Sequence, residues 1–318
     1  MRMKALYLEK SQLIIKTLPK PSPLRNEALI KVLKAGICNT DLELKKGYMR
    51  FKGIPGHEFV GLGIEATDSK VVGKRVVGEI NLSCGKCEYC LRGMKKHCAS
   101  RQVLGISNKN GALAEYLTLP LDNLHVVPSS ISDIEAVFIE PLAASLEILE
   151  QIKIKRKDSV LVLGDGKLGL LIAQVIKLRT PKVFCMGRYK RKLEILKEKE
   201  IETHLFGTKI GEKFDIIVEA TGNKKGLGEA LSLIKPKGKI ILKSTFQGEA
   251  KVDISKIVVD EIHLIGSRCG PFLRAIEVLR KKQVEVEKMV NGDFPLDRAQ
   301  EAFAFAQKPG TIKILITP

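Results

Sequence analysis

The spacing of apolar residues divides the chain near residue 140. Before that point, short segments of alternating apolar and polar residues, such as 28–33 and 74–78, are separated by glycine and proline. This pattern predicts an irregular, strand-rich domain. After that point, short apolar runs alternate with helical stretches, which predicts a parallel sheet with helices on both faces. The runs expected to form this sheet are 159–163, 182–185, 214–218, 239–242 and 262–265.

The tail of the chain has a mixed pattern. Residues 272–282 and 296–306 have helical periodicity, and 312–316 form a terminal apolar strand. We expect this tail to rejoin the strand-rich domain, and the cleft between the two domains is the expected active site. The predicted domains are 1–138 with 267–318, and 139–266.

A glycine-rich turn follows the first apolar run of the second domain. Gly164, Gly166 and Gly169 form a G-x-G-x-x-G pattern, with Lys167 and Leu168 between the last two glycines. After a strand and before a helix, such glycines permit a tight turn and a close approach of backbone N–H groups to a pyrophosphate. The turn therefore predicts a dinucleotide site; the alternative is a turn that binds nothing.

The end of the second strand predicts which dinucleotide binds. An NAD site normally has an acid there, about 20 residues after the glycines, which accepts hydrogen bonds from the ribose 2′-hydroxyl. This chain has Gly187, Arg188 and Tyr189 instead, with Lys192 nearby. Gly187 leaves room for a 2′-phosphate, and Arg188 offers a planar fork for its oxygens. The sequence favours NADP(H) over NAD(H), unless these cations only face solvent.

Two further segments follow strands at the same predicted edge of the sheet. Ala220, Thr221 and Gly222 come after the strand at 214–218, and the segment 243–246 follows the next strand. Dinucleotides bind at the carboxyl edge of such sheets, so Ala220 to Gly222 are candidates to flank the nicotinamide ribose. An ordinary strand-end turn is the alternative for both segments.

Four cysteines lie within fifteen residues, at positions 84, 87, 90 and 98. Because no export signal precedes them, their short spacings predict a closed tetrahedral zinc site rather than disulfides. Such a site has no open position for substrate, so its expected role is structural. The expected ligands are Cys84, Cys87, Cys90 and Cys98.

A second candidate metal site combines three residue types. Cys38 precedes Thr40 and Asp41, and His57 and Glu58 follow a short loop. A cysteine, a histidine and a carboxylate leave one position of a tetrahedral zinc open for substrate. Zinc there acts as a Lewis acid, which lowers the pKa of a bound hydroxyl so that hydride can leave near neutral pH.

The acidic ligand is open between Glu58 and Glu140. Adjacent side chains on an extended segment point to opposite faces, so His57 and Glu58 both bind only if the backbone turns between them. Glu140 comes from elsewhere in the chain and has no such conflict. Its alternative role is an N-terminal helix cap ahead of Pro141.

Composition narrows the expected partners. Lysine and arginine exceed the acidic residues by 54 to 36, which gives a formal net charge of +18. Such an excess suggests a polyanion partner, but the basic residues are scattered and aromatic residues make up only 5%. We therefore expect no dedicated nucleic-acid partner. No apolar run approaches the roughly 20 residues of a membrane span, and no secretory signal is recognisable, so we expect no membrane partner and a cytoplasmic location.

In their order along the chain, these motifs resemble the zinc-dependent alcohol dehydrogenases of the medium-chain dehydrogenase/reductase superfamily. The likeness covers essentially the whole chain, from the Cys38 segment and Gly-His-Glu at 56–58 to Glu-Ala-Thr-Gly at 219–222. The resemblance implies an α/β fold with a GroES-like catalytic domain and a Rossmann domain. It implies catalytic zinc on Cys38, His57 and either Glu58 or Glu140, structural zinc on the four cysteines, and a homo-oligomer, dimeric or tetrameric.

The resemblance also assigns supporting roles. Thr40 is the hydroxyl that receives the substrate proton, and Asp41 supports the zinc histidine. Many alcohol dehydrogenases of the family carry a relay histidine three residues beyond the hydroxyl residue, where this chain has Glu43. Glucose dehydrogenases of the superfamily are similar in showing Thr-Asp-x-Glu there, which favours polyol or sugar chemistry.

The expected function is a zinc-dependent oxidoreductase that transfers hydride between an alcohol, polyol or sugar, or the matching carbonyl, and NADP(H). The alternative from another class is a non-enzymatic NADP- or nucleic-acid-binding zinc protein. A zinc-free enone or quinone reductase is disfavoured, because Cys38, His57 and Glu58 would then have no reason to coincide.

Overall fold

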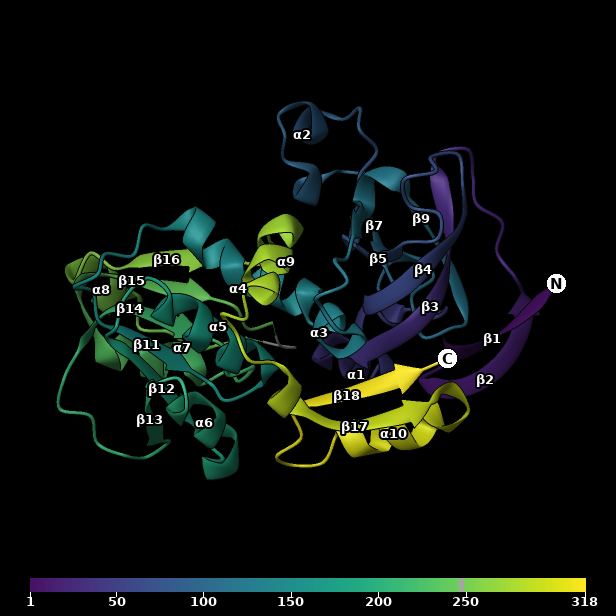
Figure 1. The fold of residues 1–318 in the computed structure, drawn as a ribbon. Helices are drawn as coiled ribbons and strands as arrows, with labels where there is room; N and C mark the ends of the chain where they lie inside the picture. Colours follow the sequence, from purple (N-terminus) through teal and green to yellow (C-terminus); the bar gives the residue numbers. More distant parts are fainter. Residues whose placement is uncertain (246–248) are drawn as a thin grey trace. The chain divides into compact units, whose positions relative to one another are not determined.

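The computed structural model describes residues 1–245 and 249–318 (Figure 1). Residue 246, at the end of the segment 243–246, lies outside the described residues. Through their internal contacts the described residues form two compact units. Unit 1 comprises Met1–Glu140, Ala275–Lys281 and Val290–Pro318, and unit 2 comprises Pro141–Arg274 and Lys282–Met289.

Unit 1 is rich in short strands, because alternating apolar residues are interrupted by glycine and proline. Its strands are β1 (Arg2–Glu9), β2 (Gln12–Pro19), β3 (Glu27–Ile37), β4 (Glu58–Ala66), β5 (Arg75–Gly78), β6 (Asn81–Leu82), β7 (Gln102–Leu104), β8 (Asn108–Lys109), β9 (Tyr116–Pro120), β10 (Leu124–Val126), β17 (Val290–Pro295) and β18 (Lys313–Thr317). Its helices are α1 (Asn39–Lys45), α2 (Glu88–Leu91), α3 (Asp133–Val137) and α10 (Ala299–Ala306), with 3-10 turns η1 (Tyr48–Arg50), η2 (Lys95–His97), η3 (Leu121–Asn123) and η5 (Leu296–Arg298).

The main sheet of unit 1 has the strand order β10-β5-β4-β3-β18-β17, with β9 also paired to β3. Strands β3 and β4 are antiparallel, with Gly36 opposite Glu58. Strand β18 pairs with the other edge of β3, with Ile314 opposite Ile37. The end of β3, the start of β4 and the last strand of the chain therefore meet at one place in the sheet.

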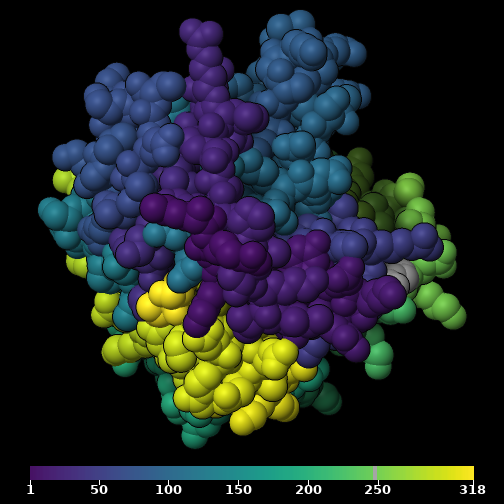
Figure 2. Space-filling view, turned by 90° about the vertical axis from the view of Figure 1, so that its right-hand side faces the viewer, coloured from purple at the N-terminus to yellow at the C-terminus, as the bar shows by residue number. Residues whose placement is uncertain are grey.

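The two ends of the chain contact each other within unit 1. The N-terminal and C-terminal segments lie side by side in Figure 2, in purple and yellow. Lys4 Nζ lies 2.8 Å from Asp297 Oδ2, and Gln300 donates a hydrogen bond to the carbonyl of Leu13. The tail is thus held by polar contacts as well as by strand pairing.

Unit 2 contains the parallel sheet. Its strands are β11 (Val160–Leu163), β12 (Val183–Gly187), β13 (Glu202–Leu205), β14 (Phe214–Glu219), β15 (Ile234–Leu242) and β16 (His263–Gly266). Its helices are α5 (Lys167–Lys177), α6 (Lys190–Lys197), α7 (Gly226–Leu233) and α8 (Ile254–Val259), with the 3-10 turn η4 (Glu287–Met289). Helices α4 (Ile139–Gln151) and α9 (Phe272–Arg280) have residues in both units.

The strand order of this sheet is β13-β12-β11-β14-β15-β16, and every neighbouring pair is parallel. In chain order this is 3-2-1-4-5-6, the arrangement of doubly wound dinucleotide-binding folds. The predicted α/β fold, with a strand-rich part and a doubly wound parallel sheet, is confirmed.

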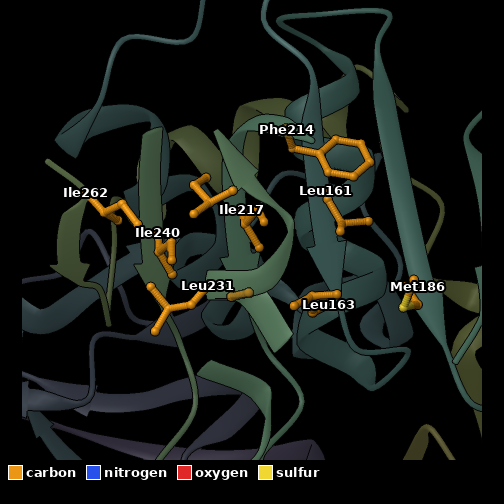
Figure 3. Packing of buried hydrophobic residues seen from close by; sticks show 10 residues of the cluster. Leu161, Leu163, Met186, Phe214, Ile217, Leu231, Ile240 and Ile262 are labelled. Atoms are coloured by element: carbon orange, nitrogen blue, oxygen red, sulfur yellow. The ribbon is translucent and has the colours of Figure 1, made fainter. Parts of the chain in front are cut away.

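One apolar core of unit 2 fills the space against the strands β11, β14 and β15 (Figure 3). Its side chains are almost fully buried, so each removes apolar surface from water at roughly 25 cal/mol per Å². This core fixes the strand ends at the carboxyl edge of the sheet. The labelled members are Leu161, Leu163, Met186, Phe214, Ile217, Leu231, Ile240 and Ile262.

The start of helix α4 differs from the expectation. Glu140 lies in the first turn of the helix rather than before it, because the helix begins at Ile139. The preceding helix α3 has the capping box instead, in which Ser132 accepts a hydrogen bond from the N–H of Glu135. Among the helices that the structure describes, none is long and apolar enough to cross a membrane.

Candidate metal and dinucleotide sites

Three predicted metal ligands meet where β3 ends and β4 begins. Cys38 follows β3 and is the N-cap of α1, while Glu58 is the first residue of β4. One donor atom each of Cys38, His57 and Glu58 lies within 4.8 Å of the other two. His57 and Glu58 are buried, and Cys38 is half-buried. A thiolate, an imidazole and a carboxylate at this spacing fit a zinc ion that keeps one position open.

The backbone resolves the conflict between adjacent ligands. Gly56 has a φ of +96°, and a Cβ there would approach Leu113 Cγ to 2.7 Å, so only glycine fits this turn. Strand β4 begins only at Glu58. His57 therefore belongs to the turn, and the alternation of a strand does not separate it from Glu58. Glu140 is not a member of this donor group, so of the two open glutamates the structure brings Glu58 to Cys38 and His57.

Asp41 contacts the segments that carry two of the three donors. Its side chain is fully buried and accepts hydrogen bonds from the N–H groups of Cys38 (2.8 Å) and Gly56 (3.1 Å). Its Oδ1 lies 3.6 Å from Nδ1 of His57. Burial by itself would raise the pKa of Asp41, but His57 and the two N–H groups outweigh burial and lower the pKa. Asp41 therefore remains charged and orients both the Cys38 segment and the imidazole.

Thr40 lies beside the thiol. Its Oγ1 is 3.8 Å from Sγ of Cys38, within the hydrogen-bonding range of sulfur. Thr40 is thus a hydroxyl in contact with one of the three donors.

Lys313 also belongs to this site, although it is not among the site residues predicted from the sequence. It is fully buried, and its Nζ forms an ion pair with Oε2 of Glu58. The ammonium lies 3.4 Å from the carbonyl of Ile37 and 5.6 Å from the ring centroid of Phe138. Burial lowers the pKa of Lys313 to about 8, against the opposing effects of nearby acidic groups. A Cβ at Gly36 would lie 2.5 Å from Nζ, which explains the glycine there.

One signal in the sequence could have identified Lys313. It is the only charged residue in the apolar run at 312–316, and a continuous apolar run predicts a strand that is buried on both faces. A charged residue inside such a strand needs a partner of opposite charge.

The four predicted structural ligands also converge. The sulfur–sulfur distances are 3.5 Å for Cys87 to Cys90, 3.8 Å for Cys87 to Cys98 and 4.0 Å for Cys84 to Cys90. Zinc–sulfur bonds of about 2.3 Å in a tetrahedron place the sulfurs roughly 3.8 Å apart, so the geometry fits a four-thiolate zinc site. The N–H groups of Ala99 and Cys90 lower the pKa of Cys87 to about 6, which favours the thiolate that binds metal.

The glycines of the predicted dinucleotide turn have different local roles. Gly164 has a φ of +119°, and a Cβ there would lie 2.5 Å from the carbonyl oxygen of Ala220. A Cβ at Gly169 would lie 2.0 Å from the carbonyl oxygen of Gly164. Gly166 meets nothing within 4 Å and is the N-cap of α5. The outer glycines therefore permit close packing, and the middle one leaves open space at a helix N-terminus that suits a phosphate group.

The predicted residues after β14 lie next to this turn. The N–H of Ala220 donates to the carbonyl of Leu163, at the end of the neighbouring strand. Thr221 donates to Glu219 through both its N–H and its hydroxyl, and the N–H of Gly222 donates to Ser244. The N–H groups of all three residues are thus engaged in hydrogen bonds within the strand-end turns.

The end of β12 differs from the expectation in one respect. The side chain of Asp165 fills the room predicted beside Gly187. A Cβ added at Gly187 would lie 2.4 Å from the Cβ of Asp165. Lys192 is buried, with its Nζ 4.9 Å from the ring centroid of Tyr189. Burial lowers the pKa of Lys192, while the carboxylate of Asp165 opposes that effect.

Comparisons with known proteins match most of the chain to two protein families. Residues 24–129 match the alcohol dehydrogenase GroES-like domain family, and residues 135–317 match the glucose dehydrogenase C-terminus family. A sorbitol dehydrogenase of Halalkalibacterium halodurans is 29% identical, and the alignment covers 94% of each chain.

Two solved structures share the fold over the whole chain. One, described as a short chain alcohol dehydrogenase (RspB) of Escherichia coli CFT073 in complex with NADH, has a TM-score of 0.93 and 28% identity and covers 100% of this chain and 99% of its own. A zinc-binding dehydrogenase of Sinorhizobium meliloti 1021 bound to NADP has a TM-score of 0.91 and 27% identity, with 100% of both chains covered. The resemblance in the sequence is thereby confirmed.

Proposed function

Because the chain belongs to the zinc-dependent alcohol dehydrogenases of the medium-chain dehydrogenase/reductase superfamily, we propose that it transfers hydride between a polyol or sugar-like alcohol and NADP(H). That it is an oxidoreductase of the alcohol dehydrogenase type follows from its family. The main support for hydride transfer at a zinc site is that donor atoms of Cys38, His57 and Glu58 lie within 4.8 Å of one another. Three protein donors leave a fourth position for the substrate oxygen.

The residues of unit 1 have separate roles in this reaction. Zinc held by Cys38, His57 and Glu58 would supply the Lewis acidity that lowers the pKa of the substrate hydroxyl. Thr40 receives the proton of that hydroxyl, since its own hydroxyl lies beside Cys38. Asp41 holds the imidazole of His57 in a fixed orientation.

The preference for NADP(H) rests on Arg188. Its guanidinium follows the strand β12, where an NAD site would carry an acid, and it can bind a 2′-phosphate through two parallel hydrogen bonds. The Sinorhizobium structure, which is bound to NADP, supports this preference by analogy. A polyol substrate is supported by the sorbitol dehydrogenase among the relatives and by Glu43, which stands in place of a relay histidine.

A metal-ligand variant tests the proposal. We expect the protein to bind two zinc ions per chain and to oxidise polyols with NADP, as measured by metal analysis and by the absorbance of NADPH. Cys38→Ala should lose one zinc and at least about a hundredfold in kcat/KM, because the substrate hydroxyl is then no longer acidified.

Cys185→Ala is the matched control for metal content, since its buried thiol lies outside both donor groups and the variant should keep both zinc ions. Full activity of Cys38→Ala would refute the catalytic role of the metal. Two zinc ions and nucleotide binding, without turnover of any alcohol or carbonyl compound, would favour a non-catalytic protein instead.

We further propose that the protein is a homo-oligomer in a reducing compartment such as the cytoplasm. Strand β16 is an edge of the parallel sheet, and α8 and β16 expose Ile254, Val258, Val259 and Leu264. Apolar side chains beside an open strand edge favour association with another chain. None of the seven cysteines forms a disulfide in the part of the chain that the structure describes, which fits a compartment that keeps thiols reduced.

A further inference from the structure

The carboxylate that the end of β12 lacks is supplied by a different part of the chain. Asp165 stands between the first two glycines of the turn after β11, and its side chain crosses to the neighbouring strand. Its Oδ2 accepts hydrogen bonds from the N–H groups of Arg188 (2.8 Å) and Tyr189 (2.6 Å). Asp165 therefore fixes the backbone that directly follows β12.

Gly187 shows that Asp165 occupies the place of a strand-end side chain. A Cβ at residue 187 would lie 2.4 Å from Cβ, 2.8 Å from Cγ and 3.0 Å from Oδ2 of Asp165. Gly187 does not have a positive φ, so its backbone would accept any residue. The three heavy atoms nearest to that Cβ all belong to Asp165, so the two positions use the same volume.

The second oxygen of Asp165 remains available to a ligand. Both hydrogen bonds of the side chain use Oδ2, and Oδ1 accepts none from the residues that the structure describes. The residue is 8% exposed, so part of it still reaches solvent. A carboxylate oxygen at the end of this strand is the group that binds the adenosine ribose hydroxyls in NAD sites.

We propose that Asp165 takes over the role of the missing strand-end acid and binds the adenosine ribose, so that the site accepts NAD(H) as well as NADP(H). This inference rests on the proposed function, because it assumes that unit 2 binds a nicotinamide dinucleotide. Asp165 limits the preference for NADP(H), since its negative charge repels a 2′-phosphate and its free oxygen binds a 2′-hydroxyl. Arg188 acts in the opposite direction, because its cation attracts the phosphate.

Binding measurements on two variants separate the two effects. The chain has no tryptophan, so the fluorescence of NADH and NADPH themselves reports their dissociation constants. Asp165→Asn keeps the shape and an acceptor for the two N–H groups but removes the charge. We expect this variant to bind NADH more weakly and NADPH more tightly than the wild type. The ratio of the two dissociation constants should then change by about tenfold or more. Arg188→Gln should weaken the binding of NADPH by a similar factor and leave the binding of NADH almost unchanged.

The matched control is Asp158→Asn, an acid just before β11 at the opposite end of that strand, which should leave the ratio unchanged. An unchanged ratio in Asp165→Asn, with the expected loss of NADPH binding in Arg188→Gln, would overturn the role of Asp165 and leave the proposed function intact. If Arg188→Gln had no effect on NADPH, the proposed preference for NADP(H) would fail instead.

A double variant tests whether the two positions are equivalent. Asp165→Gly removes the carboxylate and opens the volume beside residue 187, and Gly187→Asp then supplies the acid from the strand itself. We expect the single variant Asp165→Gly to lose NADH affinity and the double variant to recover most of it. Failure of the double variant to exceed Asp165→Gly in NADH affinity would refute the shared position.

Discussion

The side chain of Lys313 reaches the metal ligands from β18, the last strand along the chain, and its positive charge affects the charge balance of the metal site. Cys38 as a thiolate, Glu58 and Asp41 would place three negative charges in one buried region. The two charges of a zinc ion together with that of Lys313 balance them. Without the lysine, the buried carboxylate of Glu58 would lose the cation of this ion pair.

We therefore expect Lys313→Met to destabilise the metal-free protein by about 3 kcal/mol in the free energy of unfolding, since it breaks a buried ion pair. The loss should be clearly smaller when zinc is bound, because the metal cation then neutralises Glu58. Urea unfolding with and without zinc measures both values. Lys34→Met is the control. Lys34 forms an ion pair with Asp293, whose side chain is half-exposed, so this pair should contribute no more than about 1 kcal/mol. Equal losses with and without zinc would contradict the charge balance.

Particular residues show how far the sequence predicts the sites. The spacing of the four cysteines and of the three glycines identifies groups that are local in the chain, so the structure brings each of them together as expected. Lys313 and Asp165 could not be found in this way, because each acts on a segment that is distant in the sequence or belongs to another strand. The choice between Glu58 and Glu140 depended on the turn at Gly56, whose conformation no residue pattern specified.

Among the elements, strands with continuous apolar runs were predicted within a few residues. Strands β11, β12, β14 and β16 all overlap the predicted runs, because a strand covered on both faces has few alternatives. Strand β13 was missed, since its sequence Glu-Thr-His-Leu forms a half-exposed edge without an apolar run. The helix predicted at 296–306 begins as the 3-10 turn η5 and becomes α10 only at Ala299.

An ion pair between two strands makes unit 1 sensitive to acid. Glu27 of β3 lies 2.6 Å from Nζ of Lys109 in β8, and both side chains are largely buried. Burial alone would raise the pKa of Glu27, but Lys109 and the N–H of Leu24 outweigh burial and lower it. A carboxyl whose pKa is lower in the folded state stabilises the fold above its unfolded pKa of about 4.3, and this stabilisation is lost as the pH falls through the folded value.

Lys109→Met should therefore have a lower melting temperature than the wild type at pH 7. Between about pH 5 and pH 3, the melting temperature of the variant should decrease less than that of the wild type. Melting curves of both proteins across that range measure the difference. Parallel curves at all pH values would mean that the pair does not contribute to the acid sensitivity.

For the whole molecule, the proposed self-association has a direct test. We expect light scattering after size-exclusion chromatography to give at least twice the mass of the 35.2 kDa chain at micromolar concentration. Val258→Lys with Val259→Lys places two charges on the exposed face of α8 and should shift the protein toward the monomer. The exposed pair Leu24→Lys and Leu91→Lys, both in unit 1, is the control and should leave the mass unchanged. A wild-type monomer at this concentration would refute the proposal.

The place of Lys313 in the chain sets an order of events during biosynthesis. Cys38 leaves the ribosome long before β18, and at about 5–20 residues per second the delay is on the order of tens of seconds. Throughout that interval the nascent thiol and carboxylate stand without their counter-ion. A metal captured so early would bind before Lys313 pairs with Glu58, because that pair forms only when β18 lies beside β3.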